Sequence, residues 1–312
     1  DEELSLATDT LNLKISKHPL RLSFYTKDGK LINEDDPAFG TSRVGDEVTT
    51  YKTLREGERF IGLGEKTGNL DRRGEAYTNW NTDYFGYPEN ADPIYLTTPF
   101  YIGAHSDVAY GIFMDNTHKT HFNFGASNDR FSYFTADSGV MDYYFIYREN
   151  VAGIIQEYAQ LTGRMPLPPK WSLGFQQCRY SYYPDTEVLN VARGFRAREI
   201  PADVIYLDIH YMDDYKVFTW HPERFSKPKQ LIKKLEELGF HVVLIVDPGV
   251  KREEGYYAHD DGVEKDMFVK YPDGQHYSGQ VWPGWSLFPD FTKEETREWW
   301  GEKFTAYTDE LS

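Results

Sequence analysis

Two aspartates directly follow runs of apolar residues, and they are the first candidates for a functional site. Asp208 follows the run VIYL, and Asp247 follows VVLIV. A carboxylate beside buried apolar residues is costly unless it has a partner, either another protein group or a ligand. Arg179 and Tyr180 follow a third such segment, SLGFQQ. One such aspartate indicates a local cap or salt bridge, whereas two on consecutive strands favour a ligand site.

The segments that contain these positions indicate where they lie in the fold. From Trp171 onward, apolar strands alternate with amphipathic helices, and the strands are predicted at residues 172–177, 203–209 and 241–247. Such alternation is typical of a parallel sheet covered by helices. Because ligands gather at the carboxyl ends of parallel strands, we expect the aspartates to lie together there.

Three helices are predicted from apolar residues at the helical period. Asp185 is predicted to cap the first of them. The second ends at Gly239, and Thr292-x-x-Glu295 reads as a capping box that opens the third. Their apolar positions are Val188, Val191, Ala192 and Phe195, then Leu231, Ile232, Leu235 and Leu238, then Trp300, Phe304, Tyr307 and Leu311.

Residues 1–150 read as an all-β region. Short alternating or aromatic segments are separated by turn residues, which is typical of a β-sandwich. The strands are expected at LNLKIS (11–16), RLSFYT (21–26), THFNFG (120–125), RFSYFTA (130–136) and MDYYFIY (141–147). Residues 151–170 are predicted to be a helix, ended by Thr162-Gly163, and a stiff Pro-rich linker.

Residues 171–312 provide only about three β-α units, whereas a closed barrel of parallel strands needs eight. Three such strands leave a long apolar edge open to water. We therefore expect the first part of a (β/α)8 barrel and, for the chain, a piece of a longer protein. The alternative is a three-stranded α/β domain in its own right.

Composition limits the partners. Lys and Arg number 34 against 50 Asp and Glu, so the formal net charge is -16. That charge opposes nucleic acid and anionic membranes but does not penalise a neutral ligand such as a sugar. Cys178 is the single cysteine, so no intramolecular disulfide can form. The acidic start DEELSLATDT lacks the apolar core of a signal peptide, and the compartment is left open.

Other motifs indicate no metal or nucleotide site. Asp213-Asp214 and His259-Asp260-Asp261-Gly262 lack the spacing of a calcium loop, and acidic surface turns are the preferred interpretation. Gly62-x-Gly64 is too short and misplaced for a nucleotide loop. No cofactor is predicted.

Several segments together resemble glycoside hydrolase family 31, the α-glucosidase and α-xylosidase group. They fall in the family's order and spacing, and a β-region segment matches the family's pre-barrel region. The segments are LPPKWSLGFQQCRYSY (167–182), DVIYLDIHYMDDYKVFTWHPERF (203–225), VVLIVDPGV (242–250), KYPDG with VWPG and FPDF (270–291), and FIGLGEKTGNLDRRGEAYTNWNTDYFGY (60–87).

The resemblance implies a retaining exo-α-glycosidase that uses two carboxyl groups, one as nucleophile and one as acid. Both are expected after Ser312, so no catalytic residue is predicted in this chain.

Six positions match sugar-binding residues of the family. Asp208 would accept hydrogen bonds from sugar hydroxyls, Ile209 and Ile245 would form apolar walls, Tyr180 and Trp282 would supply rings, and Asp83 would reach in from a β-region loop. His210 stands where many relatives carry an Asp and is given no role.

The predicted function is an α-glucosidase acting on non-reducing ends of α-glucosides. The predicted partners are an α-glucoside oligosaccharide and the remainder of the same polypeptide. An α-xylosidase of the same family and a non-catalytic carbohydrate-binding module are the alternatives. Relative hydrolysis of aryl α-glucosides and aryl α-xylosides distinguishes an α-glucosidase from an α-xylosidase. The presence or absence of the catalytic carboxyl groups after Ser312 distinguishes an enzyme from a carbohydrate-binding module.

Overall fold

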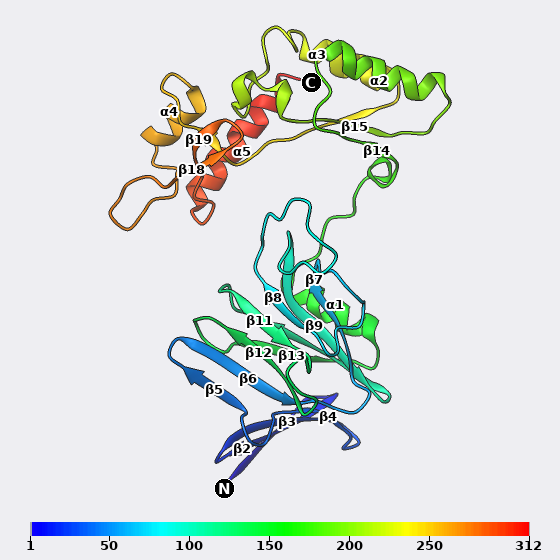
Figure 1. Cartoon of the computed structure of the whole chain (residues 1–312), viewed down its shortest axis with the longest axis vertical. Coiled ribbons are helices and arrows are strands. Elements are labelled where there is room, and N and C mark those ends of the chain that lie inside the picture. The colour runs from blue at the N-terminus through cyan, green and yellow to red at the C-terminus, as the bar shows by residue number, and fades with distance from the viewer. Residues whose placement is uncertain (1, 312) are drawn as a thin grey trace. The chain divides into compact units, whose positions relative to one another are not determined.

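The computed structural model describes residues 2–311. The chain divides into two compact units, Asp1–Met165 and Pro166–Ser312, shown in Figure 1. Each unit has its own core, and each is described separately below.

The first unit consists of three antiparallel sheets, as Figure 1 shows. One sheet contains β1 (Glu3–Ala7), β2 (Leu11–Lys17), β3 (Leu20–Thr26) and β4 (Leu31–Glu34). The second, in the order β13-β10-β9-β7, contains β7 (Arg59–Gly64), β9 (Thr97–His105), β10 (Val108–Met114) and β13 (Tyr143–Tyr147). The third, in the order β5-β6-β12-β11-β8, contains β5 (Thr41–Val44), β6 (Glu47–Thr53), β8 (Ala76–Asn79), β11 (Thr120–Asn123) and β12 (Phe131–Ala136).

Side chains of the second and third sheets share one apolar core. Phe60 and Tyr101 of one sheet cluster with Phe122 and Phe134 of the other, and all are almost fully buried. Alternating apolar residues from two facing sheets are the basis of a sandwich. The predicted β-sandwich is therefore confirmed, and every strand expected from the sequence is present.

A buried ion pair lies inside this unit. The Lys52 Nζ atom is 2.7 Å from Asp35 Oδ1, with side-chain exposures of 1% and 2%. Lys52 also donates a hydrogen bond to Tyr143 Oη at 3.1 Å. Burial by itself lowers the pKa of Lys52, but the attraction of Tyr143 and Asp35 outweighs burial and raises it.

Helix α1 (Val151–Thr162) begins where the Asn150 side chain accepts a hydrogen bond from Gly153 N and ends at Gly163. Its Ile154 is completely buried against Ile102 and Ile146 of β9 and β13. The helix thus packs on the sandwich, and the first unit extends through it to Met165.

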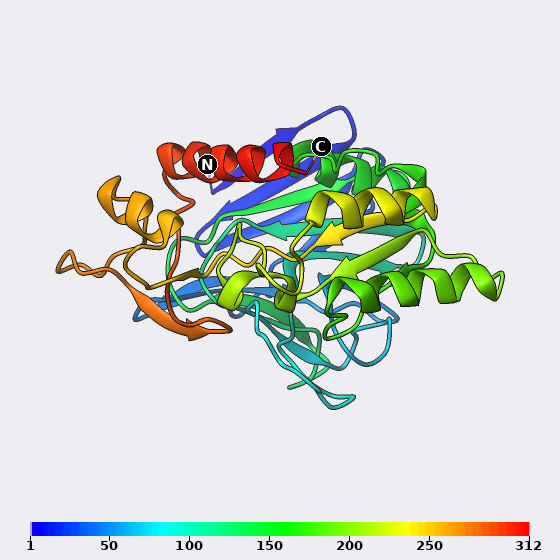
Figure 2. The ribbon, with the colours of Figure 1, turned by 90° about the horizontal axis from the view of Figure 1, so that it is seen from above.

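The second unit contains a parallel sheet of three strands in the order β14-β15-β16. These are β14 (Gln176–Gln177), β15 (Val204–Leu207) and β16 (His241–Leu244). Helices α2 (Asp185–Ala197) and α3 (Pro228–Glu237) lie along the strands, as Figures 1 and 2 show. Val188 of α2 and Leu235 of α3 pack with Ile205 and Leu207 of β15, so both helices cover the same face of the sheet.

The rest of the second unit is an antiparallel sheet with two helices. Strands β17 (Val250–Lys251), β18 (Ser278–Val281) and β19 (Gly284–Leu287) pair in the order β17-β19-β18. Helix α4 (Tyr257–Glu264) lies between β17 and β18 in the sequence, and helix α5 (Glu294–Asp309) follows β19. The sequence did not predict this sheet, because strands of two to four residues carry too few positions to show a period. It did not predict the short helix α4 either.

The fold prediction of a sandwich followed by about three β-α units is confirmed, and no closed barrel forms within residues 2–311. All three strand lengths were overestimated, and β15 covers Val204–Leu207 rather than residues 203–209. The chain after Pro169 forms the 3-10 helix η1 (Lys170–Leu173), which leaves only Gln176 and Gln177 to pair with Val204 and Ile205. Strand β16 ends at Leu244, before the acidic residue that follows it.

Three local predictions were wrong. Asp185 is the first residue of α2 rather than its cap, which is Pro184. Helix α5 begins after Lys293, because Thr292 is held outside it by a 2.6 Å hydrogen bond from its Oγ1 to Asp290 Oδ1. Residues 259–262 are not a surface turn but part of α4.

Candidate functional site

The carboxyl ends of β15 and β16 lie side by side in the second unit. Leu207 pairs with Leu244, and Ile245 N donates a hydrogen bond to Leu207 O at 3.1 Å. Tyr211, which is buried, donates from Oη to Ile245 O at 2.8 Å. The segment after β15 is therefore fixed against the end of β16, at the edge where the sequence predicts a site.

Asp208 is the first residue after β15 and is half-buried. Its Oδ1 accepts a hydrogen bond from Ile209 N at 2.7 Å and thereby caps the 3-10 helix η2 (Ile209–Tyr211). No other protein hydrogen bond to this carboxylate is present in the described part of the chain. A carboxylate has acceptor capacity for about four hydrogen bonds, so most of that capacity is open to a ligand.

A second carboxylate, Asp247, lies at the same edge and is half-buried. Burial raises the pKa of Asp247, and the negative charge of Asp208 raises it further. Cys178, after β14, responds in the same way: burial raises the pKa of its thiol and Asp208 adds to the rise. The charge of Asp208, after β15, thus acts on groups that follow both of the other parallel strands.

Two exposed aromatic rings approach each other where β14 and the β18–β19 hairpin end. The ring centroids of Tyr180 and Trp282 are 5.9 Å apart, at an interplanar angle of 43°. Tyr180 follows β14, and Trp282 lies in the tight turn in which Val281 of β18 pairs with Gly284 of β19. Tyr180 is 60% exposed and Trp282 is 61% exposed, so both rings present a large apolar surface to solvent.

His210, to which the sequence assigned no role, connects this ring pair to Asp208. Its ring stacks on Tyr183 at 4.7 Å and meets Tyr180 edge-on at 5.3 Å. Its Nδ1 lies 2.8 Å from Ser181 Oγ. Burial lowers the pKa of His210 and Arg224 lowers it further, while Asp208 acts in the opposite direction. The run Tyr-Ser-Tyr-Tyr at 180–183 was a signal for such a cluster.

The segment after η2 is held in an unusual conformation. Asp214, Tyr215 and Phe218 are not glycines, yet their φ angles are 50°, 58° and 61°. Lys251 pairs with Asp214, and Lys216 pairs with Asp213 at 3.1 Å. Such left-handed residues persist only where the surroundings determine them, and they cluster at functional sites.

The two predicted apolar walls differ in exposure. Ile245 is 37% exposed, whereas Ile209 is 1% exposed and belongs to the core of the second unit. Ile209 in this structure thus contacts the protein interior, and Ile245 remains accessible beside Asp208.

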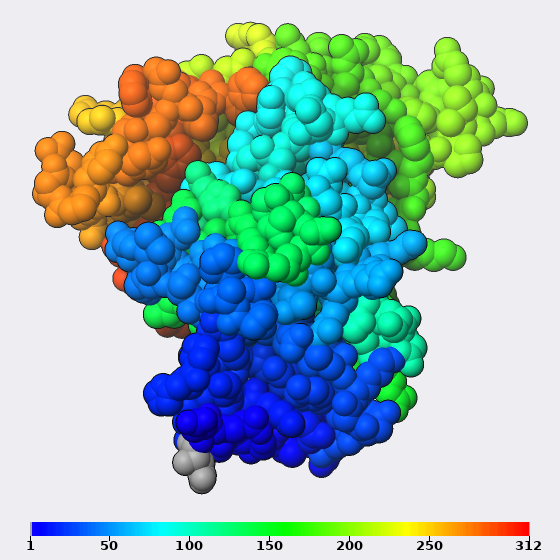
Figure 3. Space-filling model, turned by 60° about the horizontal axis from the view of Figure 1, so that its bottom comes forward, coloured from blue at the N-terminus to red at the C-terminus, as the bar shows by residue number. Residues whose placement is uncertain are grey.

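Asp83 lies in the first unit, exposed, on the connection between β8 and β9. In Figure 3 this connection (cyan) stands at the end of the first unit away from the N-terminal strands (dark blue). The structure therefore brings together Asp208, Tyr180, Trp282 and Ile245 within one unit, and places Asp83 in the other.

Within residues 2–311, no group of three or more His, Cys, Asp or Glu side chains has the arrangement of a metal site. Over the same residues, none of the helices combines the length and apolar character needed to cross a bilayer.

The fold and site together define a β-sandwich joined to the start of a parallel α/β barrel. Residues 1–123 match the profile described as the glycosyl hydrolase 31 N-terminal galactose mutarotase-like domain. Residues 165–311 match the profile described as the glycosyl hydrolases family 31 TIM-barrel domain. The chain belongs to glycoside hydrolase family 31.

Particular relatives agree with this assignment. Alpha-glucosidase 2 of Bacillus thermoamyloliquefaciens is 44% identical over 99% of this chain and 39% of its own length. The alpha-glucosidase of Saccharolobus solfataricus is 36% identical over 82% of this chain and 37% of its own length. A mutant of the Flavobacterium johnsoniae family 31 dextranase, complexed with isomaltotriose, superposes with a TM-score of 0.92 at 35% identity, covering 99% of this chain and 38% of that one.

The chain thus spans less than two fifths of the length of these relatives.

Proposed function

We propose that the polypeptide to which this chain belongs is an exo-acting retaining α-glucosidase, which hydrolyses terminal non-reducing α-linked glucose. The names of its relatives support the activity, since they include two α-glucosidases and a dextranase. The observation that carries the proposal for this chain is the Asp208 carboxylate, with one protein hydrogen bond, beside an exposed pair of aromatic rings.

Each residue has a role in the proposal. Asp208 accepts hydrogen bonds from hydroxyls of the terminal glucose, because charged acceptors form the stronger hydrogen bonds. Tyr180 and Trp282 contact the apolar faces of the sugar, and Ile245 limits the space beside it. Asp83, on the β8–β9 connection of the first unit, is proposed as a further acceptor for sugar hydroxyls. The nucleophile and the acid come from the remainder of the polypeptide.

The test is hydrolysis of maltose and isomaltose by the longer polypeptide, followed by proton NMR of the first product. An exo-acting retaining enzyme releases glucose as its α-anomer before mutarotation, because two displacements at the anomeric carbon preserve its configuration. Release of β-glucose would contradict retention, and release of larger oligosaccharides from long chains would contradict exo action. Absence of any hydrolysis would overturn the proposal of an α-glucosidase.

Hydrolysis by residues 1–312 alone is a second test of the proposal. They are expected to release no glucose from either disaccharide, because the proposed catalytic pair is not among their side chains. Glucose release above buffer that an α-glucosidase inhibitor abolishes would show that the catalytic carboxyl groups lie within this chain.

A further inference from the structure

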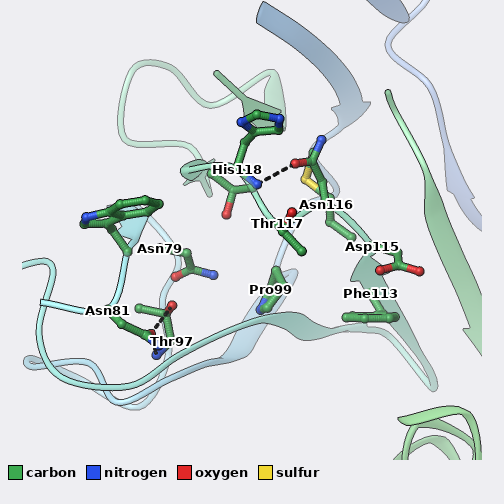
Figure 4. A pocket seen from close by; sticks show the side chains of 12 residues that line it. Asn79, Asn81, Thr97, Pro99, Phe113, Asp115, Asn116, Thr117 and His118 are labelled. Carbon is green, nitrogen blue, oxygen red and sulfur yellow. Dashed lines mark hydrogen bonds between the residues drawn. The ribbon is translucent and has the colours of Figure 1, made fainter. Parts of the chain in front are cut away.

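A pocket in the first unit lies among the ends of β8 and β10 and the start of β9, with a volume of about 520 Å³. Figure 4 shows it from close by. All of its lining residues fall between Asn79 and Thr120, so the first unit alone forms it. Its volume is within the range of small-molecule sites, about 300–1,000 Å³.

The centre of the pocket holds a buried amide without a partner. Asn79, the last residue of β8, is 4% exposed, and neither its Oδ1 nor its Nδ2 has a hydrogen-bond partner in residues 2–311. In Figure 4 its side chain lies between Asn81 on one side and Thr117 on the other. Buried amides in native proteins are almost always paired, so both atoms of Asn79 require an explanation.

Further polar groups line the same pocket. Asn81 Oδ1 accepts from Thr97 N and Thr97 Oγ1, both at 2.9 Å, which fixes the amide and leaves its Nδ2 as a donor. Asp115 adds an exposed carboxylate. Asn116 differs from these, because it donates to Ser138 O and Val140 O and accepts from His118 N. It therefore holds the wall of the pocket in place.

An aromatic ring completes the set. Trp80, next to Asn79, is 49% exposed, and Lys119 Nζ lies 5.4 Å from its ring centroid. Phe113 of β10 lines the same pocket. An apolar lining with a few fixed polar groups is the usual composition of a site for a small organic molecule.

The chemistry of these groups selects the ligand. A primary amide both donates and accepts, the Asp115 carboxylate accepts, and the Asn81 amide donates. A net charge of -16 opposes an anion. Hydroxyl groups both donate and accept, so a neutral ligand with several hydroxyl groups and an apolar face matches the chemistry of these groups. We propose that this pocket is a second carbohydrate-binding site, in which Asn79 bonds to sugar hydroxyls and Trp80 contacts the ring.

The test is calorimetric titration of residues 1–312 with isomaltotriose and maltotriose, in the background of Asp208→Asn to weaken the sugar site proposed above. Asn79→Leu keeps a similar volume and removes both unpartnered atoms. It is expected to weaken saccharide binding at least tenfold and to leave the Tm of the free protein equal or higher, because no protein hydrogen bond is lost.

Thr53→Val is the matched control, since the Thr53 hydroxyl is also buried without a partner among residues 2–311 but lies outside the pocket. It should leave the affinity unchanged. Trp80→Ala, at an exposed position, is a second test and is expected to reduce the affinity for saccharide about tenfold.

The proposal is overturned if no saccharide binds at millimolar concentration, or if binding survives both Asn79→Leu and Trp80→Ala. A Tm that falls by several degrees in Asn79→Leu would also overturn it, since the amide would then have a partner within the protein. Loss of α-glucosidase activity plays no part in this test, so the two proposals fail independently.

Discussion

Two pairs of charged residues, one in each unit, have opposite surroundings. In the first unit, Lys52 and Asp35 are almost completely buried and pair at 2.7 Å. In the second, Asp208 and Asp247 lie at one edge of a sheet, partly exposed, and the charge of one raises the pKa of the other. A buried pair of opposite charges stabilises the fold only as a pair, whereas two neighbouring acids at a strand edge are candidates for the ligand site proposed above.

Aromatic residues follow the same division. Phe60 and Tyr101 of the first unit are at most 1% exposed and interlock in its core. Tyr180 and Trp282 are 60% and 61% exposed at the strand ends of the second unit. The same kind of side chain is therefore core in one unit and exposed to solvent in the other, where we propose that it contacts a sugar.

The largest effect is expected from the buried pair. Lys52→Met leaves Asp35 buried and unpaired, which should lower the free energy of unfolding of the first unit by about 3–5 kcal/mol. Differential scanning calorimetry of residues 1–312 measures this as a Tm lower by roughly 10 °C. Lys30→Met is the matched control, because its partner Asp107 is 80% exposed and such a pair contributes at most about 1 kcal/mol.

The double variant Lys52→Met with Asp35→Asn should recover part of that loss, since the buried charge is then absent. Equal stability of Lys52→Met and the wild type would show that the pair is not structural, and the contrast between the units would fail.

The second effect concerns Asp208 in the longer polypeptide. Asp208→Asn preserves an oxygen to accept from Ile209 N but loses the charge, so the Tm should hardly change. Loss of a charged hydrogen bond in the transition state costs about 2–4 kcal/mol, or roughly 30- to 1,000-fold in kcat/KM. An early-melting variant with near wild-type kcat/KM would show that Asp208 belongs to the scaffold.

The positions of the site carboxylates could be predicted because they depend on topology. Once residues 203–209 and 241–247 were assigned to neighbouring parallel strands, Asp208 and Asp247 had to lie at one edge, and the structure places them there. The same holds for α1, α2 and α3, whose apolar periods are long enough to identify a helix.

Other features depend on contacts that a local pattern does not contain. Asp261 was interpreted as part of an acidic turn, but it lies on α4 and accepts a 2.7 Å hydrogen bond from Trp299 Nε1 of α5. Burial raises the pKa of Asp261, yet the bonds from Lys303 and Trp299 outweigh burial and hold it well below its usual range. These partners lie about forty residues away.

The surroundings of His210 were missed for a similar reason. Its stacking partner Tyr183 and its polar neighbour Ser181 lie on the connection between β14 and α2, whereas His210 follows the neighbouring strand β15. The sequence shows an unusual run of tyrosines there but not the ring that they surround.

A smaller effect is expected from the exposed ring pair. Trp282→Ala removes an aromatic surface and should lower kcat/KM of the longer polypeptide about fivefold, since such contacts contribute about 1 kcal/mol. Trp285→Ala is the matched control: that ring is 58% exposed on β19, three residues further along the chain. Equal losses in both variants would indicate a general effect on the hairpin rather than contact with substrate.

The smallest effect tests the link between the two acids through pH. Because burial and then Asp208 raise the pKa of Asp247 above its ordinary value of 3.8, the folded protein binds this proton more tightly than the unfolded chain does. Stability from Asp247 is thus complete below pH 3.8 and declines as the pH rises through the raised pKa. Asp247→Asn should therefore be more stable than the wild type at pH 7, and the difference should vanish in acid.

Asp290 provides a control of opposite sign. Hydrogen bonds from Thr292 lower the pKa of Asp290, so Asp290→Asn should be less stable than the wild type at neutral pH.

Carbon NMR of the Asp247 carboxyl group measures its pKa directly. Asp208→Asn should move the pKa of Asp247 down toward the ordinary value, since the second cause of the rise is then removed. An Asp247 pKa that does not respond to Asp208→Asn would mean that burial alone raises it. The two acids would then be separate carboxylates rather than one site, and the contrast with the Lys52–Asp35 pair would lose its basis.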